Sequence, residues 1–213
     1  MIILILAAGR GNRLKKTLPK SFPYITKSII KINNQPAIKR LINQFSLIEK
    51  NQIILALGHK YKSVLEVINN QNQKFIINNN YKNDSNLRSL FLALEKIIKD
   101  KSFDLNDGLL VVEADSFFSN SLLEKFIDHI YKLNSINAIS NKICWTGKGY
   151  ANLEDSGGFI DPIENNYSKN YGQIKNVYIN SSPNNSKSIK MYGITWFDNA
   201  SARNWYEKAK LLL

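Results

Sequence analysis

Cysteine is almost absent from this chain of 213 residues, since Cys144 is the only one. A single cysteine excludes an intramolecular disulfide framework and a metal site built from several thiolates, and it fits a reducing compartment. Histidine is nearly as rare, with His59 and His129 far apart in the sequence. The sequence therefore shows no Ser-His-Asp, Cys-His or clustered-histidine pattern.

Long apolar runs are also missing. The apolar run at the N-terminus covers only Met1–Ala8, and no basic region precedes it. It is too short for a membrane helix and has the wrong layout for a signal peptide. Because no later stretch approaches eighteen uncharged apolar residues, we expect a cytoplasmic protein that does not insert into membranes.

Acidic residues are in deficit, with 17 Asp and Glu against 29 Lys and Arg, which gives a formal charge of +12. Such a charge suits an anionic partner, and an RNA-binding protein is one interpretation. However, lysine is spread along the chain without an arginine-rich block, and asparagine and isoleucine are abundant, as in proteins from AT-rich genomes. We therefore expect a negatively charged substrate and no nucleic-acid partner.

Apolar runs and amphipathic stretches alternate over the first two thirds of the chain. The runs typical of strands lie at 2–6, 53–57, 74–77, 109–113 and 136–144. The stretches typical of helices lie between them, at 36–48, 61–68, 86–98 and 121–133. This alternation predicts an α/β fold with a mostly parallel sheet flanked by helices, in which ligands bind beyond the carboxyl ends of the strands.

The pattern changes after Cys144, where a small antiparallel insertion is expected in the C-terminal third. Its short strands are predicted at 150–153, 158–160, 173–179 and 189–197, with a turn at 154–157, a polar loop at 181–188 and a final helix at 200–213. We expect one domain over 1–213, which comprises a nucleotide-binding core (1–144), an acceptor-side antiparallel region (145–198) and a terminal helix (199–213).

The loop after the first strand carries the strongest chemical signal. It reads LAAGRGNRL over 6–14, and Pro19-Lys20 follows. Two glycines let the backbone approach a ligand, and the exposed N–H groups of such a loop bind anions. Arg13 and Lys20 add cations that can reach phosphate oxygens. The loop is neither a dinucleotide fingerprint nor a Walker loop, and its spacing alone also fits an ordinary tight turn.

The whole string, ILAAGRGNRL followed by PK, resembles the signature of the nucleotidyltransferases that activate sugar phosphates and phosphocholine with an NTP. Further segments resemble that family in the same order and cover nearly the whole chain: IKINNQPAIKRLINQFSLIE (30–49), IILALGHK (53–60), NDSNLRSL (83–90), VVEAD (111–115) and MYGITWF (191–197). The resemblance implies the Rossmann-like fold of the nucleotide-diphospho-sugar transferases and a Mg²⁺-dependent enzyme.

The chain is most similar, within that family, to the bacterial choline-phosphate cytidylyltransferases and their phosphonate-activating relatives. The likeness rests on Asn86 and Ser89, on the Glu-Ala-Asp form of 113–115, and on Cys-Trp-Thr at 144–146. It implies transfer of CMP from CTP to phosphocholine or a phosphonate, with release of pyrophosphate, for the decoration of surface polysaccharide or lipid. A sugar-1-phosphate nucleotidyltransferase and a catalytically weakened nucleotide-binding regulatory module are the alternatives.

The resemblance also assigns roles to particular residues. It implies nucleotide binding by Leu6, Ala7, Ala8, Gly9, Gly11, Asn86 and Ser89. It implies a catalytic role for Arg13 and Lys20 and Mg²⁺ binding by Asp115. It also implies that Trp145 and Tyr192 bind the acceptor. Indole and phenol faces hold a quaternary ammonium by cation–π attraction, which also makes Tyr150 and Trp196 candidates. The structural alternatives are a helix cap for Asp115, solvated cations for Arg13 and Lys20, a helix start for Asn86 and Ser89, and core packing for the aromatic residues.

One feature departs from the family pattern. The family has a second metal-binding aspartate after one more helix, whereas Asp198 precedes the final helix here and the sequence stops at Leu213. Either the second ligand lies beyond this sequence, or it comes from elsewhere, or catalysis is weakened. The sequence leaves the base, the acceptor and a homo-oligomeric state open.

Overall fold

The computed structural model describes residues 1–17, 19, 26–48, 51–69, 73–82, 86–136, 141–150, 157–162, 174–181 and 188–213. They form two compact units. The first comprises Met1–Cys144 with Thr195–Leu213, and the second comprises Trp145–Ile194. No helix in these ranges combines the length and the apolar character needed to cross a lipid bilayer.

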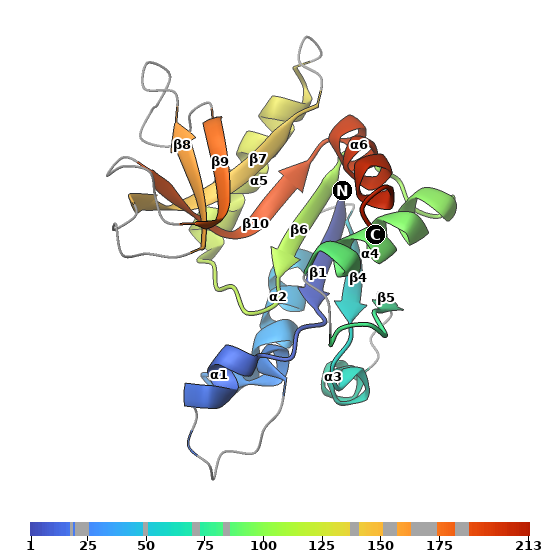
Figure 1. Ribbon diagram of the computed structural model, residues 1–213, viewed down its shortest axis with the longest axis vertical. Coiled ribbons are helices and arrows are strands. Elements are labelled where there is room, and N and C mark those ends of the chain that lie inside the picture. Colours follow the sequence, from blue (N-terminus) through green and yellow to red (C-terminus); the bar gives the residue numbers. More distant parts are fainter. Residues whose placement is uncertain are drawn as a thin grey trace. The chain divides into compact units, whose positions relative to one another are not determined.

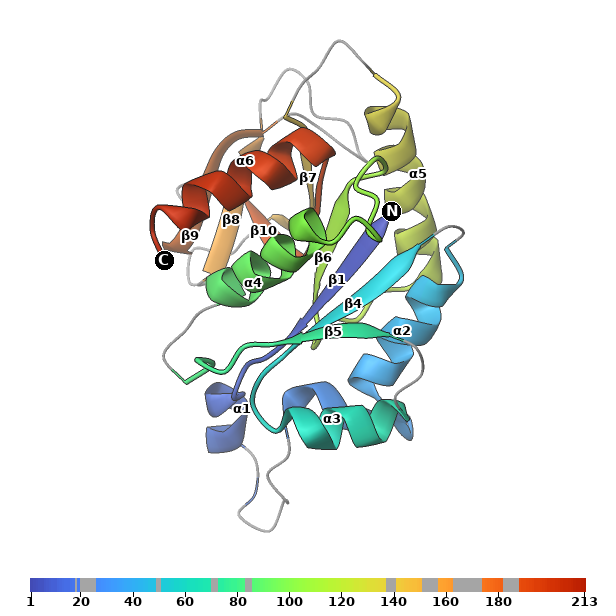
Figure 2. The same cartoon turned by 90° about the vertical axis from the view of Figure 1, so that its right-hand side faces the viewer.

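The first unit is built on a parallel sheet in the order β5-β4-β1-β6, seen in Figure 2. Its strands are β1 (Ile2–Ala7), β4 (Gln52–Leu57), β5 (Lys74–Ile77) and β6 (Leu109–Glu113). The central strand β1 is paired in parallel on both sides, with Ile2 opposite both Gln52 and Leu109. This arrangement confirms the mostly parallel sheet predicted from the sequence.

Helices cover both faces of this sheet. They are α1 (Asn12–Thr17), α2 (Ala37–Ser46), α3 (Tyr61–Ile68), α4 (Asn86–Lys99), α5 (Asn120–Asn134) and α6 (Asn199–Lys210), with a short 3₁₀ turn (Lys27–Ile29) and the hairpin strands β2 (Lys31–Ile32) and β3 (Gln35–Pro36). Figures 1 and 2 show α4 and α6 on one face and α2 and α5 on the other. Because both faces are covered, the strands are continuous apolar runs, as expected for a buried parallel sheet.

The core on the α4–α6 face contains alternate strand residues such as Ile2, Leu4 and Val111, packed against Leu94 and Tyr206. Intervening residues such as Ile3 and Ile5 are also fully buried. The helices α2 to α5 and the strands β1, β4, β5 and β6 lie where the apolar periodicity predicts them, within one or two residues at each end, whereas the short strands β2 and β3 were not predicted. The final helix ends at Lys210 rather than Leu213.

The prediction of a strand over 136–144 was wrong. The strand β7 is Ile143–Tyr150, and Ile136 lies outside any strand. Asn141 has a left-handed backbone with φ +57°, which extended structure does not tolerate. The N–H of Lys142 then donates to the Asp198 carboxylate at 2.9 Å instead of joining a strand ladder. Residues 137–140 lie outside the described part of the chain.

The second unit is antiparallel, which confirms the small antiparallel region in the C-terminal third. It holds β8 (Gly157–Pro162), β9 (Ile174–Ser181), most of β7 and the first part of β10 (Ile189–Phe197). The strand β8 pairs with β9 and with β10, where Ile160 lies opposite Ile189. The predicted strand at 150–153, the turn at 154–157 and the loop at 181–188 fall largely outside the described residues, although Gly157 begins β8.

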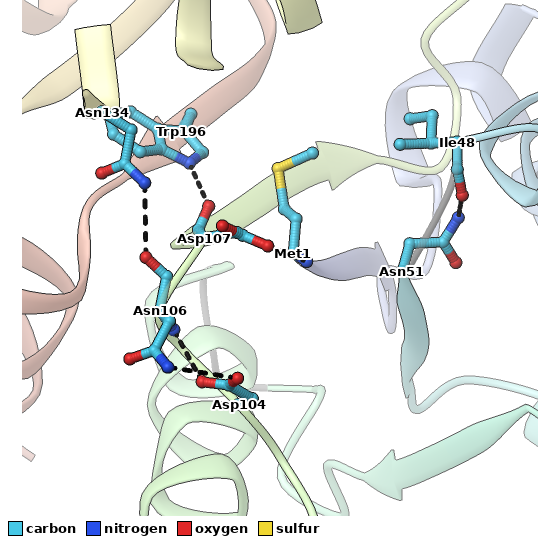
Figure 3. Close-up of polar contacts among 8 residues, drawn as sticks. All are labelled: Met1, Ile48, Asn51, Asp104, Asn106, Asp107, Asn134 and Trp196. Carbon is cyan, nitrogen blue, oxygen red and sulfur yellow. Dashed lines mark hydrogen bonds and ion pairs between the residues drawn. The ribbon is translucent and has the colours of Figure 1, made fainter. Parts of the chain in front are cut away.

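The edge of the first unit where the strands begin is held by polar contacts, drawn in Figure 3. The Trp196 indole N–H donates to the Asp107 carbonyl at 3.1 Å, and the Asn134 amide donates to the Asn106 carbonyl at 3.3 Å. Trp196 is fully buried in this core. Of the two alternatives given for Trp196, core packing therefore applies, because a side chain packed in the first unit's interior is closed to ligands.

Asp198 has a structural role. One carboxylate oxygen accepts from the Ser201 N–H at 2.7 Å, which caps the start of α6, and the other accepts from the Lys142 N–H at 2.9 Å. The side chain is buried. Both oxygens are thus occupied by backbone donors, so this late aspartate is engaged in holding α6 and the start of β7 together.

Replacing this residue, Asp198→Ala, is expected to lower the free energy of unfolding by about 2–3 kcal/mol, because a cap is lost and a buried N–H is left without an acceptor. Urea unfolding followed by circular dichroism measures the loss. The control is Asp128→Ala, since Asp128 is exposed and pairs with Lys132 on the same helix. It should cost less than about 0.5 kcal/mol. Equal effects of the two variants would contradict the structural role.

Candidate active site

The loop after β1 lies open at the carboxyl edge of the sheet. Ala7 and Ala8 are buried, whereas Gly9 is exposed and a Cβ added there would meet no atom within 4 Å. Gly11 has φ +64°, a left-handed conformation that favours glycine. The helix α1 begins at the next residue. The backbone at Gly9 is therefore accessible, while ligand binding by this loop stays a prediction.

The loops after β4 and β5 pack against this one. The N–H of His59 donates to the Ala8 carbonyl at 3.0 Å. A Cβ at Gly58 would lie 2.8 Å from the Ala8 oxygen and 2.9 Å from Cβ of Tyr81, so only glycine fits there. The His59 and Tyr81 rings lie 5.4 Å apart. These contacts hold the loop after β1 in place against the loops after β4 and β5.

An ion pair stands at the same edge. Lys27 Nζ lies 2.5 Å from Asp115 Oδ2, and the two side chains are 33% and 41% exposed. Lys27 begins the 3₁₀ turn, between the buried residues Thr26 and Ser28 that anchor its backbone. Asp115 lies two residues after the end of β6. The structure thus joins the predicted metal ligand to a cation that the sequence reasoning missed.

Lys27 gave little sequence signal. It lies 88 residues from Asp115, outside the glycine loop and outside the Pro19-Lys20 step. Its one recognisable feature is its position just before the apolar segment that begins the family-like stretch at 30–49.

Glu113 and Asn86 form a second contact beside the ion pair. The Asn86 amide donates to Glu113 Oε1 at 3.1 Å, and Glu113 lies opposite Leu6 in the strand register. The N–H of Ala114 donates to the Leu6 carbonyl at 3.1 Å, which extends the pairing of β6 with β1 beyond the strand. The structure thus brings the predicted residues Leu6 and Asn86 to the edge that carries Asp115.

Ser89 lies deeper than Asn86. It is buried, and its hydroxyl accepts from the Asn78 amide at 3.0 Å. Asn78 is buried as well, and its backbone N–H donates to the Leu57 carbonyl at 2.7 Å. This chain of contacts ties α4 to the end of β4. Nucleotide contact by Ser89 stays a prediction, while its visible role is to hold Asn78.

The remaining candidates belong to the second unit, or lie partly or wholly outside what is described. Lys20 lies outside the described residues, and of Arg13 only the backbone, within α1, is described. Trp145 and Tyr192 belong to the second unit, where both are half-buried and the Thr146 hydroxyl donates to the Tyr192 carbonyl at 2.7 Å. Of Tyr150 only the backbone, at the end of β7, is described.

Cys144 is not an activated nucleophile. Burial raises the pKa of its thiol to about 11, so the thiol is protonated at neutral pH. Reactive cysteines have a lowered pKa and lie in electropositive surroundings. Covalent catalysis through this thiol is therefore disfavoured.

The oxygen donors at the edge fit Mg²⁺ better than a metal that needs several protein ligands. The described residues contain no group of three or more His, Cys, Asp or Glu side chains that could hold a metal. Mg²⁺ usually takes one or two protein carboxylates, waters and substrate phosphates. The half-exposed carboxylate of Asp115, with Glu113 two residues earlier, can supply such a partial ligand set.

Comparison with known proteins identifies the family. Residues 3–142 match the MobA-like NTP transferase domain. The chain belongs to this family. That membership supports nucleotidyltransferase activity for the NTP transferase domain described here, and it agrees with the position of the glycine loop and of Asp115 at one edge of the sheet.

The individual relatives are distant. The bifunctional protein GlmU of Buchnera aphidicola subsp. Acyrthosiphon pisum is 28% identical over 180 residues, which are 84% of this chain. The chain spans only 36% of that relative's length. Most of the relative's length therefore has no counterpart in this sequence.

Solved structures share the fold. The CTP:phosphocholine cytidylyltransferase LicC of Streptococcus pneumoniae superposes with a TM-score of 0.62 at 20% identity, covering 99% of this chain and 78% of that one. A UDP-glucose pyrophosphorylase gives 0.61 at 17% identity, over 92% and 75%. The inositol-1-phosphate CTP transferase of T. maritima gives 0.59 at 13%, over 99% and 80%. These similarities confirm the nucleotide-diphospho-sugar transferase fold.

The Lys27–Asp115 pair should contribute little to stability, because a partly exposed ion pair is screened by water. Asp115→Asn is expected to change the free energy of unfolding by less than about 1 kcal/mol. Urea unfolding of this variant, run beside Asp198→Asn, provides the measurement. A loss for Asp115→Asn as large as that for Asp198→Asn would mean that Asp115 serves the fold instead of a ligand.

Proposed function

We propose that this NTP transferase domain transfers a nucleoside monophosphate, CMP from CTP, to a small phosphorylated acceptor such as phosphocholine or a phosphonate. One observation carries the proposal: the Lys27–Asp115 pair lies beside the glycine loop at the carboxyl edge of the sheet. A cation and a carboxylate at that place suit a nucleoside triphosphate, whose phosphates need cations and whose metal needs oxygen ligands.

The proposed reaction is a single displacement at phosphorus. An oxygen of the acceptor's phosphate attacks the α-phosphorus of the NTP and forms a new P–O bond. The bond from that phosphorus to the bridging oxygen breaks, and pyrophosphate leaves with the electron pair. Because the acceptor oxygen is already ionised at neutral pH, alignment and charge stabilisation suffice without a general base.

The chain's own residues would supply that stabilisation. Backbone N–H groups around Ala8, Gly9 and Gly11 would hold phosphate oxygens. Lys27, together with the predicted cations Arg13 and Lys20, would balance the charge that develops on pyrophosphate. A Mg²⁺ ion held by Asp115 would neutralise the triphosphate when bound.

The acceptor side is assigned to the antiparallel region. We propose that 1–144 binds the nucleotide, that 145–198 covers the acceptor and that 199–213 is a terminal helix of the same domain. The Trp145 and Tyr192 rings would hold a quaternary ammonium by cation–π attraction. The shared fold with a CTP:phosphocholine cytidylyltransferase supports this choice of substrates.

A sugar-1-phosphate acceptor is the second candidate. The superposition with a UDP-glucose pyrophosphorylase is nearly as close, with a TM-score of 0.61 against 0.62. Pyrophosphate release should be measured with Mg²⁺, each of the four NTPs, and phosphocholine, 2-aminoethylphosphonate or hexose 1-phosphates. Release with CTP and phosphocholine or the phosphonate supports the first candidate, and release with a hexose 1-phosphate supports the second. NTP binding without release would instead favour a regulatory module.

Removing either charge of the pair should impair turnover. Lys27→Met and Asp115→Asn are each expected to lower the rate of pyrophosphate release by about 10²–10³-fold, since each removes charge stabilisation from the reacting phosphates. The control is Lys132→Met, which removes an exposed lysine that pairs with Asp128 on α5. It should turn over like the unaltered chain. Unchanged turnover in Lys27→Met or Asp115→Asn would contradict the proposed assignment.

A further inference from the structure

The carboxylate of Glu113, at the end of β6, contacts the first residue of α4. Glu113 Oε1 accepts from the Asn86 amide at 3.1 Å, and both residues are exposed. Leu6, where the segment with the two glycines begins, lies opposite Glu113 in the strand register, and Asp115 follows two residues after Glu113. The contact therefore belongs to the edge of the sheet at which the nucleotide is proposed to bind.

The charge of Glu113 decides which way the Asn86 amide turns. An ionised carboxylate offers acceptors only, so the atom of Asn86 that faces it must be the amide nitrogen, Nδ2. A hydrogen bond to a charged group is roughly twice as strong as one between neutral groups, which favours this orientation of the amide. Because the two ends of an amide point in different directions, Asn86 Oδ1 is directed away from Glu113. Asn86 therefore presents an acceptor, and not a donor, to a ligand at this edge.

An acceptor of fixed orientation selects among the groups of a nucleoside triphosphate. Phosphate oxygens are acceptors themselves, so they gain no hydrogen bond from Asn86 Oδ1. Ribose hydroxyls both donate and accept, so they can bind an amide that is turned either way. The pyrimidine bases differ at their 4-position, where cytosine carries an N–H donor and uracil a carbonyl acceptor. The fixed orientation of the amide therefore matters most for the base.

We propose that Glu113 is a positioning residue for the choice of base. It holds Asn86 so that Oδ1 accepts from the 4-amino group of cytosine and opposes the 4-carbonyl of uracil. This role rests on the proposed function, whose nucleotide is CTP. Glu113 itself touches neither base nor phosphate in this role, because it acts through the Asn86 amide.

Glu113→Gln tests the role, because it keeps the shape of the side chain and removes its fixed polarity. A glutamine can accept from Asn86 Nδ2 or, with its own amide turned, donate to Asn86 Oδ1, and the second arrangement directs Nδ2 to the base. Uracil then finds a donor. We expect the ratio of CTP affinity to UTP affinity to fall about tenfold, mainly through tighter binding of UTP. Calorimetric titration of the full chain with each nucleotide, with Mg²⁺ and without acceptor, measures the ratio.

The matched control is Glu95→Gln, the same charge change within α4, where Glu95 pairs with Lys99. Loss of a negative charge strengthens the binding of both nucleotides alike, so the ratio in this control should equal that of the unaltered chain. A second variant, Asn86→Leu, should also lose the preference for CTP, since leucine has no amide to present to the base.

The possible outcomes separate this role from the proposed function. If CTP does not bind the unaltered chain, the proposed function fails and the role of Glu113 fails with it. If CTP binds but Glu113→Gln keeps the ratio of the control, only the role of Glu113 is overturned. Equal weakening of CTP and UTP by Glu113→Gln would show that Glu113 serves the metal or the fold, and it would overturn the role as well.

Discussion

The parallel pairing of β1 with β4 on one side and β6 on the other is the constraint on which the candidate site depends. Because Leu6 lies opposite both Ala56 and Glu113, the residues that follow these strands must emerge at one edge. That edge receives the glycine loop, Gly58 and Asp115 together. The backbone bond from His59 to Ala8 and the bond from Ala114 to Leu6 extend the same register into the loops. The site is thus a consequence of strand register, and each loop needs only a short polar sequence to complete it.

Two aspartates show how burial separates a structural from a functional carboxylate. Asp198 is buried and gives both oxygens to backbone N–H groups, so its charge is already balanced by hydrogen bonds. Asp115 is half-exposed and contacts the single, flexible side chain of Lys27. A lysine can turn to a phosphate when a ligand arrives, whereas a capped helix must unwind its first turn to release its carboxylate. The arrangement at Asp115 therefore suits a residue that has to accept a new partner, and the arrangement at Asp198 does not.

Much of the fold was predictable because the strands are buried on both faces and therefore read as continuous apolar runs. The range 74–77 was predicted to the residue, and so was 109–113. The strand expected at 136–144 failed because a distant carboxylate, Asp198, binds the Lys142 N–H, and local sequence holds no sign of this contact. Lys27 was missed for the same reason, since its partner is 88 residues away. Trp196 lies in a segment whose alternating pattern is also compatible with a surface position. Its contact with the Asp107 turn in the structure shows that it belongs to the core.

The segment from Asp115 to Asn120 connects the candidate active site to α5 and is held by α2. It begins with the carboxylate proposed for the metal and ends at the start of α5, where Gln44 binds Asn120 and the Phe118 carbonyl. The Arg40 guanidinium lies 5.5 Å from the centre of the Phe117 ring, so α2 contacts this segment at a second point. Since backbone restrained at one end of so short a connection limits the other end, these contacts from α2 restrict the positions open to Asp115.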